Sequence, residues 1–172
     1  MKKAQISQIF IYILALFIFA LIIYYGYFGI NSILIKGEEV AYIRFKTDLE
    51  NAVQGVLPMH GRFLPFNKDN PLSVPGKITE VCFVSSAKIG DANFAAQIED
   101  QDPIIALSVE EGTQENVFIL PREQARQQIY LPKIKVPEDF MCVETVQGRL
   151  DITLRNIGID GVLIEEYIEP AE

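Results

Sequence analysis

The pattern of hydrophobic and polar residues divides the chain into two parts. An apolar run fills residues 9–30 near the N-terminus, and beyond it apolar and polar residues alternate with helical and strand periods. Residues 4–35 contain no Asp, Glu, Lys, Arg or His, whereas all 23 acidic residues follow Lys36. The two parts are therefore adapted to different solvents.

The apolar run Ile9 to Ile30 is long enough to cross a membrane. As a helix it would span roughly 33 Å, and the hydrocarbon core of a bilayer is about 30 Å thick. A cleaved secretory signal would have a shorter apolar region followed by a small-x-small site, whereas this run ends in "YYGYFGINS". Its tyrosines suit the headgroup level. We therefore expect a retained transmembrane helix rather than a cleaved signal or a buried core helix.

The positive charges that flank the run predict its orientation. Lys2 and Lys3 precede it, whereas Lys36 follows it alone and is succeeded by two glutamates. Since lysine-rich flanks stay in the cytoplasm, we expect a single-pass cell-membrane protein with a cytoplasmic N-terminus. Residues 1–36 then form the N-terminus and the membrane helix, and residues 37–172 form one extracellular domain.

A second, amphipathic helix is predicted over about residues 38–56. Gly37 could separate it from the membrane helix or lie within one long helix, and Gly55 and Pro58 end it. We expect its apolar face to pack on the domain's own sheet, the alternative being a contact with neighbouring subunits. The residues of this face are Tyr42, Phe45, Leu49, Ala52, Val53 and Val56.

The remainder of the domain is predicted to be rich in β-strands over about residues 77–168. Residues 58–76 contain four of the nine prolines and are expected to form an extended surface connection. Gln147 and Gly148 separate two strand patterns and indicate a hairpin. The strand patterns are "KITEVCFVS", "IIALSV", "NVFIL", "FMCVETV", "RLDITLR" and "GVLIEEYI". The predicted fold class is α+β, with the helix packed on a mainly antiparallel sheet.

Charge and the missing motifs exclude several functions. Residues 37–172 carry 12 basic and 23 acidic residues, a net charge of −11 that repels nucleic acid and anionic lipid. His60 is the one histidine, and it lies in a proline-rich segment without a nucleophile motif. "NKDN" at 67–70 and "EDQD" at 99–102 do not match a calcium-binding loop. We expect no enzyme activity, no cofactor, no metal site and no nucleic-acid partner.

Two cysteines, Cys82 and Cys142, lie in two predicted strands of the extracellular domain. An even number of cysteines in an oxidising compartment makes a disulfide between them the simplest pairing. Closing such a loop stabilises a fold by about 4 kcal/mol in the chain-entropy model. Two buried free thiols are an alternative, and a metal site is another, for which the sequence shows too few ligands.

The opening residues "KKAQIS", followed by a long apolar helix, resemble the class III signal peptides of archaeal type IV pilin-like proteins. In that family a basic and a small residue precede a cut before Gln, and the helix is left intact for assembly. The resemblance implies that Lys3 and Ala4 flank the cut, that a prepilin-type peptidase makes it, and that Gln5 and Ser7 form the family's Q-x-S start.

Two further observations bear on this resemblance. Many members of the family carry Glu where this chain has Ile9, and that acid has a role in docking subunits. Three segments, "FKTDLENAV", "ITEVCFVSS" and "GRLDITLRNIG", are similar to small, uncharacterised archaeal membrane-anchored proteins, which implies a cell-surface context but no activity.

The sequence thus leaves three function classes. The first is a pilin-like structural subunit, anchored or assembled through its apolar helix with copies of itself or other pilin-like subunits. The second is a membrane-anchored extracellular binding module or accessory subunit of a surface complex, since a plain anchor also needs basic residues before its apolar run. An anchored enzyme comes third, because no catalytic motif supports it.

Overall fold

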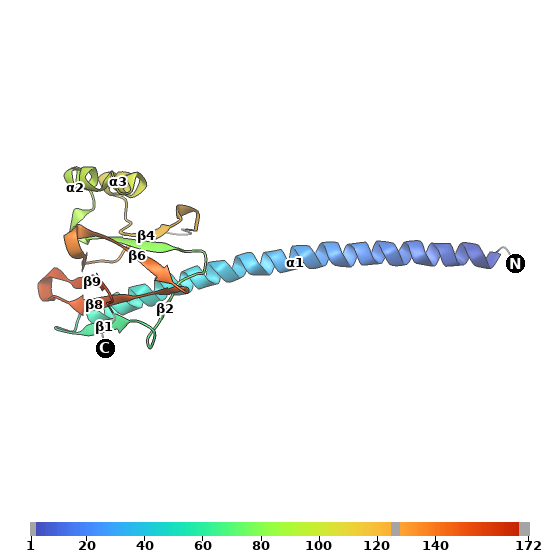
Figure 1. The fold of residues 1–172 in the computed structure, drawn as a ribbon, viewed down its shortest axis with the longest axis horizontal. Coiled ribbons are helices and arrows are strands. Elements are labelled where there is room, and N and C mark those ends of the chain that lie inside the picture. The colour runs from blue at the N-terminus through green and yellow to red at the C-terminus, as the bar shows by residue number, and fades with distance from the viewer. Residues whose placement is uncertain (1–2, 125–127, 169–172) are drawn as a thin grey trace. The chain divides into compact units, whose positions relative to one another are not determined.

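The computed structural model describes residues 3–124 and 128–168, without the side chains of residues 3–9, 31–35 and 124. The chain forms two compact units, Met1–Val40 and Ala41–Glu172. One helix, α1 (Lys3–Val56), belongs to both units, and its hydrogen-bonded pattern continues through Gly37 (Figure 1).

The first unit holds a helical segment suited to a membrane. Phe10–Ile30 has a mean hydropathy of 2.3, and none of its most apolar stretch is buried within the protein. Its 21 residues satisfy the length required to cross a bilayer. An apolar surface of this kind on all sides of a helix is compatible with lipid or other apolar helices around it.

The second unit is an α+β domain with two mostly antiparallel sheets. One sheet has the strand order β1-β8-β9-β5, in which β5 is parallel to β9, and the other has the order β2-β7-β6-β3-β4. Its strands are β1 (Phe63–Phe66), β2 (Leu72–Ser73), β3 (Glu80–Val84), β4 (Val117–Leu120), β5 (Ile134–Lys135), β6 (Phe140–Val146), β7 (Arg149–Leu150), β8 (Ile152–Asn156) and β9 (Val162–Glu166). Helices α2 (Ala92–Ile98) and α3 (Pro103–Glu110) and the short 3-10 helices η1 (Ser86–Lys88), η2 (Arg122–Gln124), η3 (Pro137–Asp139) and η4 (Gly158–Asp160) lie between strands.

The main core lies between α1 and the two sheets. The predicted apolar face of α1 is confirmed: Tyr42, Phe45, Leu49, Val53 and Val56 are buried, and Ala52 is partly buried. A second, smaller core forms on the opposite face of β3, β4 and β6, where α2 and α3 cover the sheet (Figure 1). β3 and β4 are therefore buried on both faces, whereas β6 is only partly buried.

The C-terminal end of α1 is tied to the sheet by a buried side chain. Asn156, on β8, donates its Nδ2 to the carbonyl oxygens of Val56 at 2.9 Å and Leu57 at 2.7 Å. Carbonyl groups at a helix end have no partner within the helix, so this amide satisfies two of them. The predicted helix end near Gly55 and Pro58 is confirmed at Val56.

Several strand predictions are confirmed. β3, β4, β6 and β9 lie within the predicted patterns, and β8 extends one residue beyond its pattern, to Asn156. Gln147 and Gly148 form the β6–β7 turn, both with positive φ (54° and 72°), as the tight hairpins that match strand twist require. In β7 and β8, Leu150, Ile152 and Leu154 form the buried face as predicted.

Other predictions are wrong. "IIALSV" forms helix α3 rather than a strand, because Asp102 accepts hydrogen bonds from the backbone N–H groups of Ile104 and Ile105 and Pro103 occupies the first turn. Residues 58–76 contain strands β1 and β2, so they are not only a surface connection. Helix α2 and strand β5 were not predicted from the sequence.

The core role of α1 predicts the effect of a truncation. Phe45→Ala should destabilise the domain by about 3–5 kcal/mol, because Phe45 is fully buried and its removal leaves a cavity. Ile43→Ala, on the same helix but 44% exposed, is the matched control and should cost far less. Urea unfolding of the full chain in detergent measures both. Equal losses for the two variants would contradict the packing of α1 described above.

Candidate functional site

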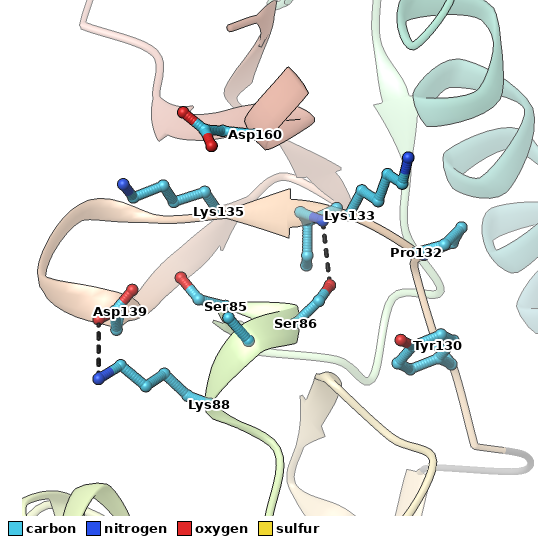
Figure 2. A pocket seen from close by; sticks show the side chains of 11 residues that line it. Ser85, Ser86, Lys88, Tyr130, Pro132, Lys133, Lys135, Asp139 and Asp160 are labelled. Carbon is cyan, nitrogen blue, oxygen red and sulfur yellow. Dashed lines mark hydrogen bonds and ion pairs between the residues drawn. The ribbon is translucent and has the colours of Figure 1, made fainter. Parts of the chain in front are cut away.

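An open groove lies between the 3-10 helix η1, which follows strand β3, and strand β5 of the four-stranded sheet (Figure 2). Its volume is about 560 Å³. Residues from the end of β3 and η1 form one wall, and residues 130–135 form the other. The lining residues are Ser85, Ser86, Ala87, Lys88, Tyr130, Pro132, Lys133, Ile134, Lys135, Asp139 and Asp160.

A buried polar network fixes the wall of the groove before β5. Asn116, fully buried on its side chain, donates from Nδ2 to the Leu131 carbonyl at 2.8 Å and accepts from the Leu131 N–H at 2.8 Å. Ser86 Oγ donates to the same carbonyl at 2.9 Å and accepts from the Ile134 N–H at 3.0 Å (Figure 2). Each such bond contributes about 1 kcal/mol, and an unpaired buried partner would cost more. The side chains of Asn116 and Ser86 therefore hold residues 131–134 in position rather than contact a ligand.

Close backbone contacts join Lys133, just before β5, to the start of β9. The Val162 N–H donates to the Lys133 carbonyl at 2.9 Å. Gly161, at φ 106°, lies beside it, and a Cβ there would be 1.9 Å from the Lys133 carbonyl oxygen. Only glycine fits, both because of this approach and because of its φ value.

Three lysines give the groove a basic character within an acidic domain. Lys88 is neutralised by Asp139 at 3.5 Å and Asp91 at 3.9 Å. Lys133 and Lys135 have no carboxylate within 4 Å among the residues that the structure describes. Figure 2 shows their side chains extending to opposite sides, so their ammonium groups do not converge on one point. This arrangement suits an elongated ligand with separated acidic groups better than a single small anion.

A second candidate site surrounds the disulfide. The Cys82–Cys142 bond is present, as the sequence predicted, and it joins residues directly opposite each other on β3 and β6. One step along the same face, Glu80 stands directly opposite Glu144. The ligand atoms of Glu80, Cys82 and Cys142 all lie within 4.8 Å of one another.

The surroundings of Glu80 change its acidity. Burial, followed by the charges of Glu144 and Asp102, raises the pKa of the Glu80 carboxyl above its ordinary value of 4.5. Like charges directly opposite each other on antiparallel strands destabilise a sheet. At neutral pH the Glu80–Glu144 pair therefore opposes folding.

Neither the groove nor the disulfide site includes the other residues that the sequence predicted. Lys3, Ala4, Gln5 and Ser7 lie in the first turns of α1, where their side chains are outside the described residues. His60 is exposed in the turn after α1. Among the described residues, His60 is neither in the groove lining nor in the group around the disulfide.

The two acidic segments considered for calcium have local structural roles. In "NKDN", Asn67 Oδ1 accepts from the backbone N–H groups of Asp69 and Asn70. In "EDQD", Asp102 caps helix α3. Turn formation and capping account for these residues without a ligand.

Sequence reasoning missed the groove entirely. Its residues come from positions between 85 and 160, and only the pairing of β5 with β9 and the Asn116 network bring them together. The one local signal is "PKIKVP", where two lysines alternate with apolar residues in a domain of net negative charge. That pattern indicates an edge strand with a basic outer face.

Comparison with protein families, with characterised proteins and with solved structures found no match to this chain. The fold and the two sites therefore rest on the chain's own geometry. The resemblance to pilin-like proteins rests on the opening residues and on the apolar helix that follows them.

The raised pKa of Glu80 predicts a pH-dependent stability. The folded protein holds this proton more tightly than the unfolded chain, so stability falls as the pH rises above 4.5 through the folded pKa. Glu80→Gln, which stays neutral, should be more stable than the parent at pH 7, and the difference should vanish below pH 4.5. Urea unfolding of the disulfide-bonded chain at both pH values measures this.

The control for this prediction removes the same charge elsewhere. The control variant is Glu110→Gln, because Glu110 is exposed at the last residue of α3. An equal, pH-dependent gain in this variant would assign the effect to the net charge of the domain rather than to the surroundings of Glu80.

Proposed function

We propose that this chain is a non-enzymatic cell-surface subunit of pilin-like type, anchored or assembled through the apolar segment of α1. The observation that carries the proposal is Phe10–Ile30, an apolar helix with no part of its most apolar stretch buried within the protein. The same helix α1 ends as the main core element of the α+β domain. Anchor and domain thus share one element.

The composition of the apolar segment favours packing among like helices. Within Phe10–Ile30 the polar groups are tyrosine hydroxyls and backbone, so no buried hydrogen bond selects one particular partner. Association of such helices in lipid relies on van der Waals packing, to which the small residues Ala15, Ala20, Gly26 and Gly29 contribute. The glycines have open space around them in the single chain.

The domain carries two features that support an extracellular location. Its disulfide is typical of oxidising compartments, and its net negative charge favours solubility over contact with anionic lipid. Together with the lysines before the span, these features support a cytoplasmic N-terminus and an external domain.

The groove favours a second candidate function, a membrane-anchored binding module. Lys133 and Lys135, which have no carboxylate partner among the described residues, would contact acidic groups of an extended partner segment. In this function the apolar helix only anchors the domain. The two functions differ in what happens to residues 1–4.

Processing of the N-terminus distinguishes them. If the pilin-like function holds, mass spectrometry of the native protein should find a chain that begins at Gln5, and sheared surface material should contain filaments. Ala4→Phe should block the cut, because a bulky side chain replaces the small residue before it, whereas Gln8→Ala should be processed normally. A mature chain that begins at Met1 or Lys2, found as detergent-solubilised monomers without filaments, leaves the anchored module.

The orientation has its own test. Protease added to intact cells should digest the domain of residues 37–172, because two lysines precede the span and one follows it. A cytoplasmic marker protein controls for lysis. Protection of the domain until lysis would invert the orientation.

A further inference from the structure

We propose that reduction of the Cys82–Cys142 disulfide converts this part of the β3–β6 pair into a zinc site with two thiolate ligands and the Glu80 carboxylate. The inference goes beyond the proposed function and does not depend on it. It rests on the register of two strands and on the distances between three side chains.

The register places four suitable side chains on one face of the sheet. Cys82 faces Cys142, and Glu80 faces Glu144, two residues further along each strand. Side chains two residues apart in a strand share a face, so the four form a square of neighbouring positions. In the sequence these four residues do not form a ligand set, because the two members of each facing pair lie more than 50 positions apart.

The distances are compatible with a tetrahedral ion once the two sulfurs are no longer bonded to each other. Zinc binds thiolate sulfur at about 2.3 Å and carboxylate oxygen at about 2.0–2.2 Å, so ligand atoms around it lie roughly 3.3–3.8 Å apart. The three ligand atoms already lie within 4.8 Å of one another. Separation of the two sulfurs after reduction moves them toward the spacing that zinc requires. Glu144 or water would complete the coordination.

The burial of the residues also fits a metal site. Cys82 is fully buried, whereas Cys142 and Glu80 are half-buried. An open depression of about 550 Å³, lined in part by Glu80 and Glu144, adjoins the carboxylates. An ion would enter from this side, with the sulfurs at the buried end. A divalent cation there would also offset the repulsion between the two glutamates.

The chemistry balances as two steps. A dithiol breaks the S–S bond, gives two electrons and two protons to form two thiols, and itself becomes a disulfide. A phosphine does the same with protons from water and becomes a phosphine oxide. Zinc then replaces the two thiol protons, which are released to solvent. Two zinc–sulfur bonds and one zinc–oxygen bond form, and no other redox change occurs.

The test uses the full chain in detergent, reduced with a phosphine that is then removed under anaerobic conditions. Zinc titration against a chromophoric chelator should show one tightly bound ion per reduced chain, and at least about a hundredfold weaker binding to the disulfide form. Cobalt in place of zinc should give thiolate-to-cobalt charge-transfer absorption. Zinc binding of equal strength before and after reduction would overturn the proposal.

Variants identify the ligands. Glu80→Gln should weaken zinc binding at least tenfold, and Glu110→Gln, which removes an exposed carboxylate from α3, should leave it unchanged. The double variant Cys82→Ser/Cys142→Ser should abolish binding. If Glu80→Gln binds zinc as tightly as the parent, Glu80 is not a ligand and the proposal fails.

Circular dichroism measures whether reduction unfolds the domain and whether zinc refolds it. Metal binding contributes to folding when the site exists only in the folded state. Zinc should then restore the spectrum of the disulfide form. A reduced chain that unfolds and is not restored by zinc also overturns the proposal.

Discussion

The packing of one face of α1 against two sheets is the interaction on which the domain depends. Each of the five buried side chains on that face contributes about 1.5–3 kcal/mol on transfer from water, so together they contribute roughly as much as the net stability of a typical domain. Both sheets contribute to this core, and Asn156 ties the helix end to β8. Without the helix, neither sheet would have a complete apolar partner. The elements that form the groove and the disulfide site are thus held indirectly by α1.

Periodicity predicted the parts of the fold that local pattern determines. The face from Tyr42 to Val56, the end of α1 and the Gln147–Gly148 hairpin could all be read from the sequence, because spacing and turn residues suffice for them. The helix α3 was mistaken for a strand because a short apolar run fits either structure. The Asp102–Pro103 pair before it was the signal that could have decided the matter.

The candidate sites were predictable only in part. Pairing of the cysteines followed from their number and from the oxidising compartment expected for the domain, but their position opposite each other beside Glu80 depends on strand register. The groove depends on a two-residue parallel pairing of β5 and on the contacts of a buried asparagine. Such contacts join segments far apart in the sequence, and neither hydrophobic pattern nor charge encodes them locally. The sequence places Asn116 as the first residue of the strand pattern "NVFIL" and gives no sign of its contacts with Leu131.

The disulfide also determines which parts of the domain would carry a mechanical load. A subunit held by its N-terminal helix and pulled at its C-terminal strands would transmit the force from β3 to β6 through the bond, not through the 60-residue segment that the bond closes. About 200 Å of extended chain is thereby withheld from stretching. That segment contains α2, α3 and every groove residue except Asp160. The Asn116 network of the groove thus lies within the protected segment, whereas the pairing of β5 with β9 joins the groove to a strand that bears the load.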